Sequence, residues 1–297
     1  MLLAVLAGDA RERAAAIGLA RRGHVVRTFG GVGGPLESDE ALTALVDADA
    51  VLGPALGTNL AGDQLRRAAG DPPLPLQEAW LDAPRRGAPW VLGSAGPWLR
   101  RQVGARGGKV HAYVDAPAFA VLNAVPTAEG AIAEATRRAG RTVWGTSALV
   151  VGGGCCGLAL TRRLVAFGAE VVCAGQTSAE RAAIAAAGAQ PIPTTGQALT
   201  VAAARCVLLF NTAPAPLIDV RVLGSLPTGA VVVDVASSPG GTDFAAAEAL
   251  GVQATLLPGI PGRMYPETAG RIVVDVMLEI LAGRTGGDMG GGDAGNQ

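Results

Sequence analysis

The sequence predicts an α/β protein built from two doubly wound parallel-sheet domains with a cleft between them. Short apolar runs alternate with amphipathic helical stretches, which is typical of parallel strands covered by helices on both faces. The alternation forms two successive series, each beginning with a strand that ends in glycine, and 297 residues suit about two domains. We therefore expect Rossmann-like domains at 1–125 (substrate) and 126–283 (cofactor), and a disordered glycine-rich tail at 284–297.

The first series opens with a buried strand, an amphipathic helix and a second strand, which together form a β-α-β unit. Residues 30–39 and the proline-rich stretch 71–80 interrupt it and are expected to be loops. The predicted strands are 2–8, 24–30, 48–53 and 88–94, and the predicted helices are 10–23, 58–69 and 97–105.

A helix at 126–140, opened by Pro126 in its first turn and ended by Gly140, is predicted to connect the domains. The last helix, 266–283, has one apolar face and is expected to return to pack against the first domain. Between these helices the second series predicts one strand that begins at 147 and further strands at 169–175, 206–211, 230–236 and 252–258. Helices are predicted directly after the strand that begins at 147 and at 178–188 and 243–251.

The composition favours a small-molecule site in a cytoplasmic protein. A net charge of −1 gives no basic surface for nucleic acid or anionic lipid. The opening MLLAVLAG is too short for a signal peptide and no run of 18 apolar residues occurs, so no membrane segment is expected. The four cysteines are expected to be reduced and buried. Neither His24 nor His111 has the neighbours of a metal site, so no metal is expected.

The stretch SALVVGGGCCGLAL at 147–160 carries the spacing G-x-G-x-x-G between a strand and a helix. In a dinucleotide-binding turn the first glycine bends the chain, the second lets the backbone approach the pyrophosphate, and the third lets helix and strand pack closely. These positions are Gly152, Gly154 and Gly157, and the pyrophosphate would sit on the helix N-terminus near Cys155 and Cys156. The alternative is a tight turn that holds no ligand.

The loop after the next strand contains no acid at 174–178, where an NAD-selective protein usually has one. It offers Gln176, Thr177 and Ser178 instead, with Arg181 one turn further on. This favours NADP, with NAD as the alternative.

Ligands of open α/β sheets gather at the carboxyl ends of the strands, where four loops are rich in polar residues. Candidate catalytic residues are Asp9, Arg11, Thr127 and Glu129. Further cofactor contacts are predicted at Asn211, Thr212, Ala236 and Ser237, and substrate contacts at Ser94, Asn123, Thr242 and Arg263. Each has a structural alternative: Asp9 with Arg11 could be a helix N-terminal pair, Glu129 a capping partner, and Thr127 and Asn123 helix caps.

Several segments, in this order along the chain, resemble the dipicolinate synthase A family. They are GDARE near the N-terminus, NAVPTAEGAI at 123–132, the glycine loop, FNTAP at 210–214, DVASSPGGTDF at 234–244 and LPGIPGRMYPETAGRI at 257–272. The resemblance implies an oxidoreductase of sporulation that works with a flavoprotein-like B subunit. It would form dipicolinate from a 4-hydroxy-tetrahydrodipicolinate precursor, with NADP or NAD as cofactor, and it leaves a homo-oligomer open.

The chain departs from this family at three positions. Gln176 and Ser238 stand where members carry arginine, and Glu267 stands where they carry lysine. The first departure weakens the NADP prediction. The other two remove positive charge from loops that could meet a dicarboxylate, for which Arg263 could substitute.

Two other functions remain open. One is another two-domain NAD(P)-dependent dehydrogenase of the 2-hydroxy-acid kind, although such enzymes rely on a late histidine and none follows His111. The other is a nucleotide-binding regulatory subunit without catalysis.

Overall fold

The computed structural model describes residues 1–68 and 70–283, which divide into two compact units. Unit 1 comprises Met1–Ala120 and the chain from Pro266 onward, and unit 2 comprises Val121–Tyr265. The sequence-based boundaries at 125 and 283 had grouped the last helix with the second domain. The contacts instead group it with the first. The tail predicted at 284–297 lies outside the described residues.

Unit 1 is built on a six-stranded, fully parallel sheet in the order β3-β2-β1-β4-β7-β8. The central strand β1 is almost wholly buried, as expected for a strand covered on both faces. The strands are β1 (Leu2–Leu6), β2 (Val25–Phe29), β3 (Glu37–Ser38), β4 (Ala50–Leu52), β7 (Trp90–Leu92) and β8 (Val110–Ala112), and a small hairpin pairs β5 (Gln64–Leu65) with β6 (Leu74–Pro75).

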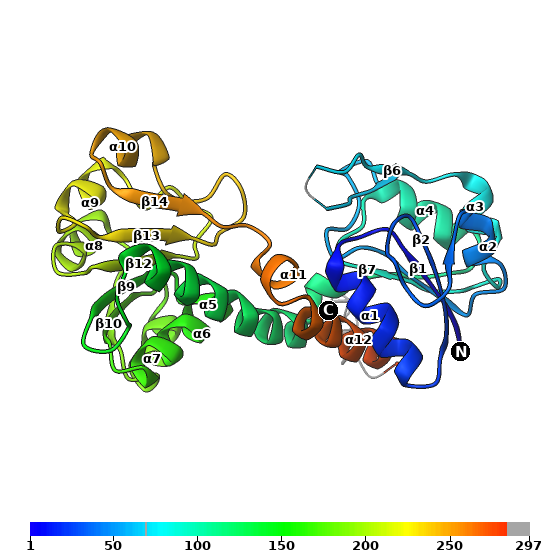
Figure 1. Cartoon of the computed structure of the whole chain (residues 1–297), viewed down its shortest axis with the longest axis horizontal. Coiled ribbons are helices and arrows are strands. Elements are labelled where there is room, and N and C mark those ends of the chain that lie inside the picture. The colour runs from blue at the N-terminus through cyan, green and yellow to red at the C-terminus, as the bar shows by residue number, and fades with distance from the viewer. Residues whose placement is uncertain (69, 284–297) are drawn as a thin grey trace, which may run out of the picture. The chain divides into compact units, whose positions relative to one another are not determined.

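The helices of unit 1 are α1 (Ala10–Arg21), α2 (Ala41–Leu45), α3 (Glu78–Asp82), α4 (Pro97–Ala105), the short helix η1 (Tyr113–Asp115) and α12 (Pro266–Leu281). The last helix, α12, packs against α1 (Figure 1). A Cβ on Gly270 would lie 2.7 Å from Ala14 Cβ and 2.8 Å from Arg11 O, so glycine permits this close approach. Buried Val273, Val274 and Met277 complete the core beneath the sheet.

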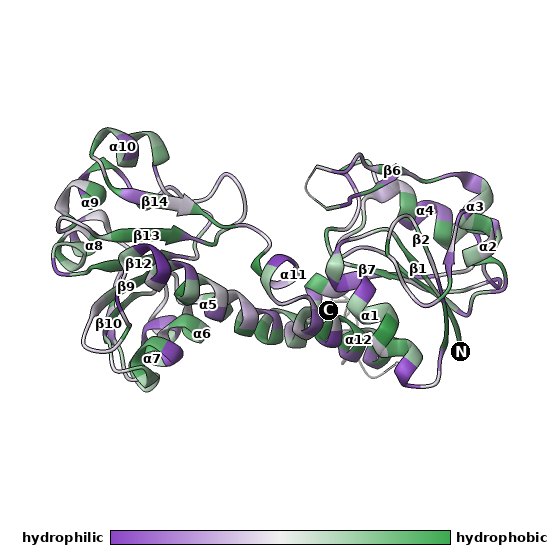
Figure 2. Cartoon of the chain, viewed as in Figure 1, coloured by the Kyte–Doolittle hydropathy of each residue, from purple (hydrophilic) through white to green (hydrophobic). Residues whose placement is uncertain are grey.

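Unit 2 repeats the same topology, with six parallel strands in the order β11-β10-β9-β12-β13-β14. β13 is buried throughout and hydrophobic along most of its length (Figure 2). The strands are β9 (Ser147–Val151), β10 (Glu170–Ala174), β11 (Gln190–Ile192), β12 (Leu208–Asn211), β13 (Val231–Asp234) and β14 (Gln253–Leu256). The helices are α5 (Pro117–Ala139), whose first four residues belong to unit 1, α6 (Cys155–Ala166), α7 (Ser178–Ala186), α8 (Gly196–Ala203), α9 (Val220–Ser225), α10 (Phe244–Ala249) and α11 (Ile260–Met264).

The main sheet of each unit has the order 3-2-1-4-5-6 that defines a Rossmann-type sheet, so the predicted fold class of two such domains is confirmed. Most predicted strands and helices occur within about two residues of their expected bounds. The elements that were not predicted are the strands β3, β5, β6, β8 and β11 and the helices α2, α3, α8, α9, α11 and η1.

Two predicted helices are wrong. Of the range 58–69, residues 58–68 form a loop and the strand β5, because Asn59 Oδ1 accepts hydrogen bonds from the amides of Gly62, Asp63 and Gln64 and so holds a turn. The connector begins at Pro117 rather than Pro126, which lies inside α5. The segment 123–129 is therefore helical and not a loop at a strand end.

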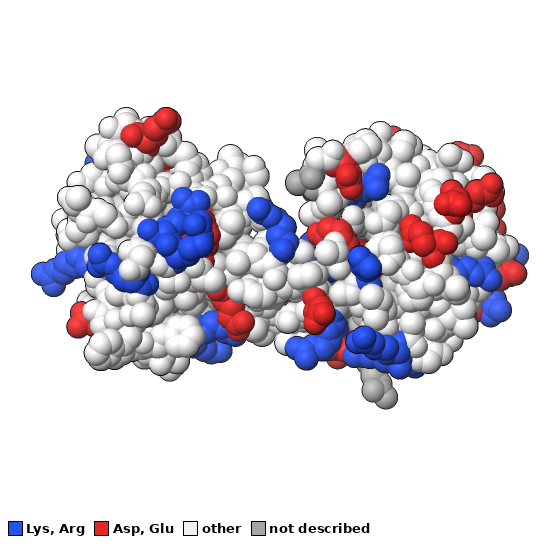
Figure 3. Space-filling model, viewed as in Figure 1, with Lys and Arg blue, Asp and Glu red and all other residues white. Residues whose placement is uncertain are grey.

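In the described residues no helix has the length and apolar content that crossing a membrane needs. Charged side chains of both signs are scattered over the face seen in Figure 3. All four cysteines are free; Cys173 and Cys206 are buried as expected, whereas Cys155 is exposed at the start of α6.

Candidate functional site

The predicted glycine loop joins β9 to α6 at the carboxyl edge of the unit 2 sheet. Gly152 has a φ of +114°, a conformation that other residues rarely adopt. A Cβ on Gly157 would overlap the carbonyl oxygen of Gly152, and a Cβ on Gly152 would overlap Thr212 Oγ1. Both glycines are therefore needed to let the helix lie against the strand and its neighbour.

Gly154 differs from the other two glycines, because a Cβ there would meet no atom within 4 Å. It is the N-cap of α6 and supplies no side-chain cap. The first amides of a helix have no intrahelical acceptor, and the helix dipole makes this end positive. The open space beside these amides fits the pyrophosphate of a dinucleotide. Of the adjacent cysteines, Cys155 is exposed and Cys156 is half-buried.

The first turn of α7, just after the loop that follows β10, contains an acid that was not predicted as a site residue. Thr177 caps α7, and Glu180 completes the capping box by accepting from the amides of Gln176 (2.6 Å) and Thr177 (3.4 Å). A Cβ on Gly153 would lie 2.7 Å from Glu180 Cβ, so this side chain lies against the glycine loop. The predicted cofactor contacts Gln176 and Ser178 are exposed. The spacing T-x-x-E could have identified the capping box.

A buried polar network joins the ends of β12 and β13. Asp234 Oδ2 accepts hydrogen bonds from Asn211 Nδ2 (2.9 Å), the Gly241 amide (2.8 Å) and Thr242 Oγ1 (2.7 Å). Its Oδ1 accepts from the amide of Ala236 at 2.9 Å. Asn211 is fully buried and Thr242 nearly so, and these bonds use their side chains to hold the loop in place.

The other cofactor candidates lie beside this network. Thr212 Oγ1 donates to the carbonyl of Val151 at 3.1 Å and so fixes the strand next to the glycine loop. Ala236 is buried, whereas Ser237 is exposed. The structure thus brings the loops after β9, β10, β12 and β13 to one edge of the sheet.

A pocket of about 340 Å³ in unit 2 lies between α5, β14 and α11 and contains the substrate candidate Arg263. Arg138 also lines it and is bonded to Glu134, whose pKa Arg137 and Arg138 together lower to about 2. Arg263 is exposed, and among the described residues its guanidinium makes one hydrogen bond, a long one of 3.4 Å to the carbonyl of Pro258. Its guanidinium is therefore available to an anion.

The connector candidates lie on α5. Thr127 is buried, and its hydroxyl donates to the carbonyl of Asn123 at 2.8 Å, which is a bond within the helix. Glu129 is exposed and pairs with Arg163 on α6 at 3.1 Å. Among the described residues, no hydrogen bond or ion pair orients either side chain toward the glycine loop.

In unit 1, Asp9 and Arg11 form an ion pair at the N-terminus of α1 with a separation of 2.9 Å. Burial alone would raise the pKa of Asp9, but Arg11 outweighs it and leaves that pKa below its usual value. Arg11 is only 7% exposed, so its guanidinium serves this pair rather than an open site. Ser94 follows β7 and is exposed, and its carbonyl accepts from the Thr58 amide.

The same corner contains Glu12, which ends the segment GDARE but was not predicted as a site residue. Its two carboxyl oxygens accept from the amides of Asp9 (2.7 Å) and Ala55 (2.8 Å). Burial raises the pKa of Glu12 to about 7 against the opposing charge of Arg11. Nearby, the hydroxyl of fully buried Tyr113 has no partner among the described residues.

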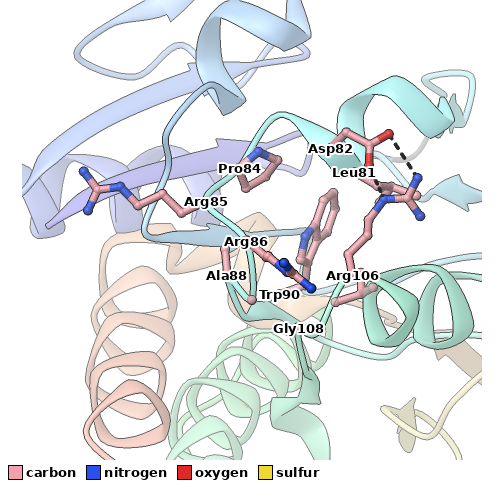
Figure 4. A pocket seen from close by; sticks show the side chains of 11 residues that line it. Leu81, Asp82, Pro84, Arg85, Arg86, Ala88, Trp90, Arg106 and Gly108 are labelled. Atoms are coloured by element: carbon pink, nitrogen blue, oxygen red, sulfur yellow. Dashed lines mark hydrogen bonds and ion pairs between the residues drawn. The ribbon is translucent and has the colours of Figure 1, made fainter.

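A pocket of about 240 Å³ in unit 1 is a poorer candidate (Figure 4). Arg106 faces Asp82 and forms two hydrogen bonds with it, at 2.6 and 3.1 Å. Trp90 begins β7, so the pocket lies at the amino end of a strand. Ligands of such sheets bind at the opposite edge.

No family model matches the sequence. Over 164 residues the chain is 36% identical to the dipicolinate synthase A subunit of Bacillus subtilis (strain 168). This match spans 55% of the chain and 54% of that protein, so the chain spans about half the length of the curated relative it matches.

Solved structures extend the likeness to most of the chain. The dipicolinate synthase A subunit from Bacillus halodurans superposes with a TM-score of 0.80 at 28% identity, covering 94% of this chain and 97% of that one. Its Bacillus subtilis counterpart gives 0.78 at 27%, covering 95% and 96%. A transhydrogenase from Sinorhizobium meliloti shares the fold alone, with a TM-score of 0.66 at 18% identity over 94% and 93%. The resemblance predicted from the motifs is thus confirmed: the chain is similar in sequence and in fold to dipicolinate synthase A subunits.

Proposed function

We propose that this chain is the A subunit of a dipicolinate synthase and that it forms dipicolinate with a nicotinamide dinucleotide as cofactor. The observation that carries the proposal is the uncapped N-terminus of α6, with open space at Gly154 inside a complete glycine fingerprint. The similarity to dipicolinate synthase A proteins in sequence and fold supports the choice of reaction.

The reaction converts a hydroxylated tetrahydropyridine dicarboxylate into an aromatic ring. It loses one water, one hydride and one proton, and the bound dinucleotide would supply the hydride acceptor. Because aromaticity drives the change, the protein mainly has to position the substrate against the cofactor and exclude competing reactions. This is a dehydrogenase step on a CH–CH or a ring C–N bond.

The residues of unit 2 suit distinct parts of this task. The amides that begin α6 would bind the pyrophosphate. The Asp234 network would hold the loop 236–242 rigidly at the same sheet edge, leaving Ser237 exposed toward solvent and ligand. Arg263, whose guanidinium is exposed, is the best candidate for a substrate carboxylate.

The other candidate catalytic and substrate-binding residues have weaker support. Glu129 is exposed and could exchange its partner Arg163 for a reacting group, so we retain it as a candidate acid or base. Exposed Ser94 and half-buried Asn123 remain candidate substrate contacts. Asp9, Arg11, Thr127 and Thr242 are bonded within the protein, and we assign them to positioning.

The partner and setting belong to the same proposal. Similarity to proteins described as one subunit of a synthase supports a second, B subunit as partner. We further propose, as the family resemblance implies, that this partner is flavoprotein-like and that the pair works in the cytoplasm of a sporulating cell. The sequence predicted NADP as cofactor from the acid-free stretch 174–178. Glu180 bears directly on that choice, because it brings a carboxylate to the same loop.

The test mixes the full chain with its B subunit, the hydroxylated dicarboxylate and either dinucleotide, and follows the ultraviolet band of dipicolinate. We expect a product band and stoichiometric reduction of the dinucleotide, and neither without this chain. Two folded subunits that give no dipicolinate with either dinucleotide would contradict the proposal and favour a regulatory role.

A further inference from the structure

Glu180 brings a carboxylate to the place where the adenosine ribose of a dinucleotide lies. In dinucleotide folds this ribose sits beside the loop after the second strand, next to the glycine turn. Glu180 contacts both sides of that place: its side chain lies against Gly153, and its Oε2 binds the amides of Gln176 and Thr177. Residues 174–178 contain no acid, and the first turn of α7 supplies one instead.

The hydrogen bonds of Glu180 also remove the donors that a 2′-phosphate would use. Backbone amides of such a loop are ready partners for a phosphate, but here both are already bonded to a carboxylate. A phosphate at this position would meet a like charge and lose those amides. A ribose hydroxyl would instead find an acceptor, since Glu180 Oε1 has no hydrogen bond in the described part of the chain.

Arg181 does not offset this charge fully. Its Nη1 donates to the carbonyls of Gly175 (3.0 Å) and Gln176 (2.9 Å), which ties the guanidinium to the backbone of the loop. Within the described residues it makes no ion pair with Glu180. The net arrangement favours a neutral ribose over a phosphorylated one.

We infer that Glu180 determines cofactor specificity and makes this chain prefer NAD to NADP. This rests on the proposed function in one respect, namely that a dinucleotide binds the glycine loop. It reverses the preference predicted from residues 174–178 alone.

The experiment measures the dissociation constants of NAD and NADP separately by calorimetry on the full chain. The wild type should bind NAD at least tenfold more tightly than NADP. Glu180→Gln removes the charge while glutamine keeps the capping box, so α7 should remain folded. In this variant the NAD-to-NADP preference should fall at least tenfold, because NADP itself binds more tightly.

Glu170→Gln is the matched control, because Glu170 begins β10 and is exposed at the opposite end of the same strand. It should leave the preference unchanged. A wild type that binds NADP more tightly, or a Glu180→Gln variant whose preference equals that of the wild type, would overturn the inference and leave the proposed function standing. An equal change in both variants would show a general charge effect and also overturn it. If neither dinucleotide binds the wild type, the proposed function fails as well.

Discussion

The Asn211 amide donates to Asp234 Oδ2 at 2.9 Å and so links the carboxyl ends of two neighbouring strands of the unit 2 sheet. The same carboxylate accepts three further hydrogen bonds from the loop that follows β13. A fully buried acid with every oxygen satisfied is stable only as a complete network. The loop at the proposed cofactor edge therefore depends on this one side chain.

Asp234→Asn should destabilise unit 2 by about 2 kcal/mol. The amide nitrogen of asparagine would face a donor, so at least one charge-assisted hydrogen bond is lost and a buried amide is left without an acceptor. Urea denaturation followed by far-ultraviolet circular dichroism measures the change. Asp243→Asn is the control, because Asp243 is the N-cap of α10 and asparagine caps equally well. Equal stability of the two variants would contradict this role for Asp234.

The buried Glu12 should make the stability of unit 1 fall as the pH rises. At a pH below 4.5 the carboxyl is protonated in both states. Between 4.5 and about 7 the unfolded chain loses the proton while the folded chain keeps it, so stability is lost across that window and then levels off. A pKa raised from 4.5 to about 7 corresponds to about 3 kcal/mol.

The two histidines act in the opposite direction, because burial lowers the pKa of both His24 and His111. The measurement is therefore the difference between the wild type and Glu12→Gln, taken at pH 5 and pH 8 by urea titration. Tryptophan fluorescence reports mainly on unit 1, which contains Trp80, Trp90 and Trp98. We expect the variant to gain about 2.5 kcal/mol relative to the wild type between these pH values, because part of the loss already occurs below pH 5. A difference that is independent of pH would exclude a buried, protonated Glu12.

Replacement by alanine should change the stability of the protein very differently at Gly154 and Gly157, the second and third glycines of the fingerprint. At Gly157 the added Cβ overlaps the Gly152 carbonyl, and the backbone has to move at a cost of about 3 kcal/mol. At Gly154 the Cβ meets nothing, and the cost is at most about 1 kcal/mol for a poorer N-cap. Thermal melting of both variants compares them directly. Similar melting temperatures would show that the close helix–strand approach is not needed.

Features that local patterns determine could be predicted from the sequence. Most of the strands, the Rossmann-like fold class and the glycine loop follow from apolar periodicity and from glycines at fixed spacing. The helix predicted at 58–69 failed because a single side chain, Asn59, captures three amides and holds a turn that periodicity does not reveal. Pro126 was interpreted as a helix start, but α5 begins at Pro117 and continues through Pro126.

The candidate site was harder to predict, because the partners of its residues lie far apart in the sequence. Asn211 looked like a ligand contact, yet its amide is used by Asp234, 23 residues away. Glu12 was overlooked because its second oxygen binds the amide of Ala55, which a sequence pattern cannot show. Glu180 was local and detectable, but it lies two residues beyond the stretch in which an acid is usually sought.

The central claim is that the N-terminus of α6 binds the pyrophosphate of a dinucleotide, and Gly154→Asp tests it most directly. The backbone of Gly154 is extended and its surroundings are open, so aspartate should cap the helix and leave the melting temperature unchanged or slightly higher. Gly154→Asn is the control, since it has the same shape and capping ability without the charge. Calorimetry with the dinucleotide that binds the wild type more tightly should give an affinity at least tenfold lower for aspartate than for asparagine, because the carboxylate occupies and repels the phosphate position. An aspartate variant that binds the dinucleotide as tightly as the wild type would show that the loop is only a turn.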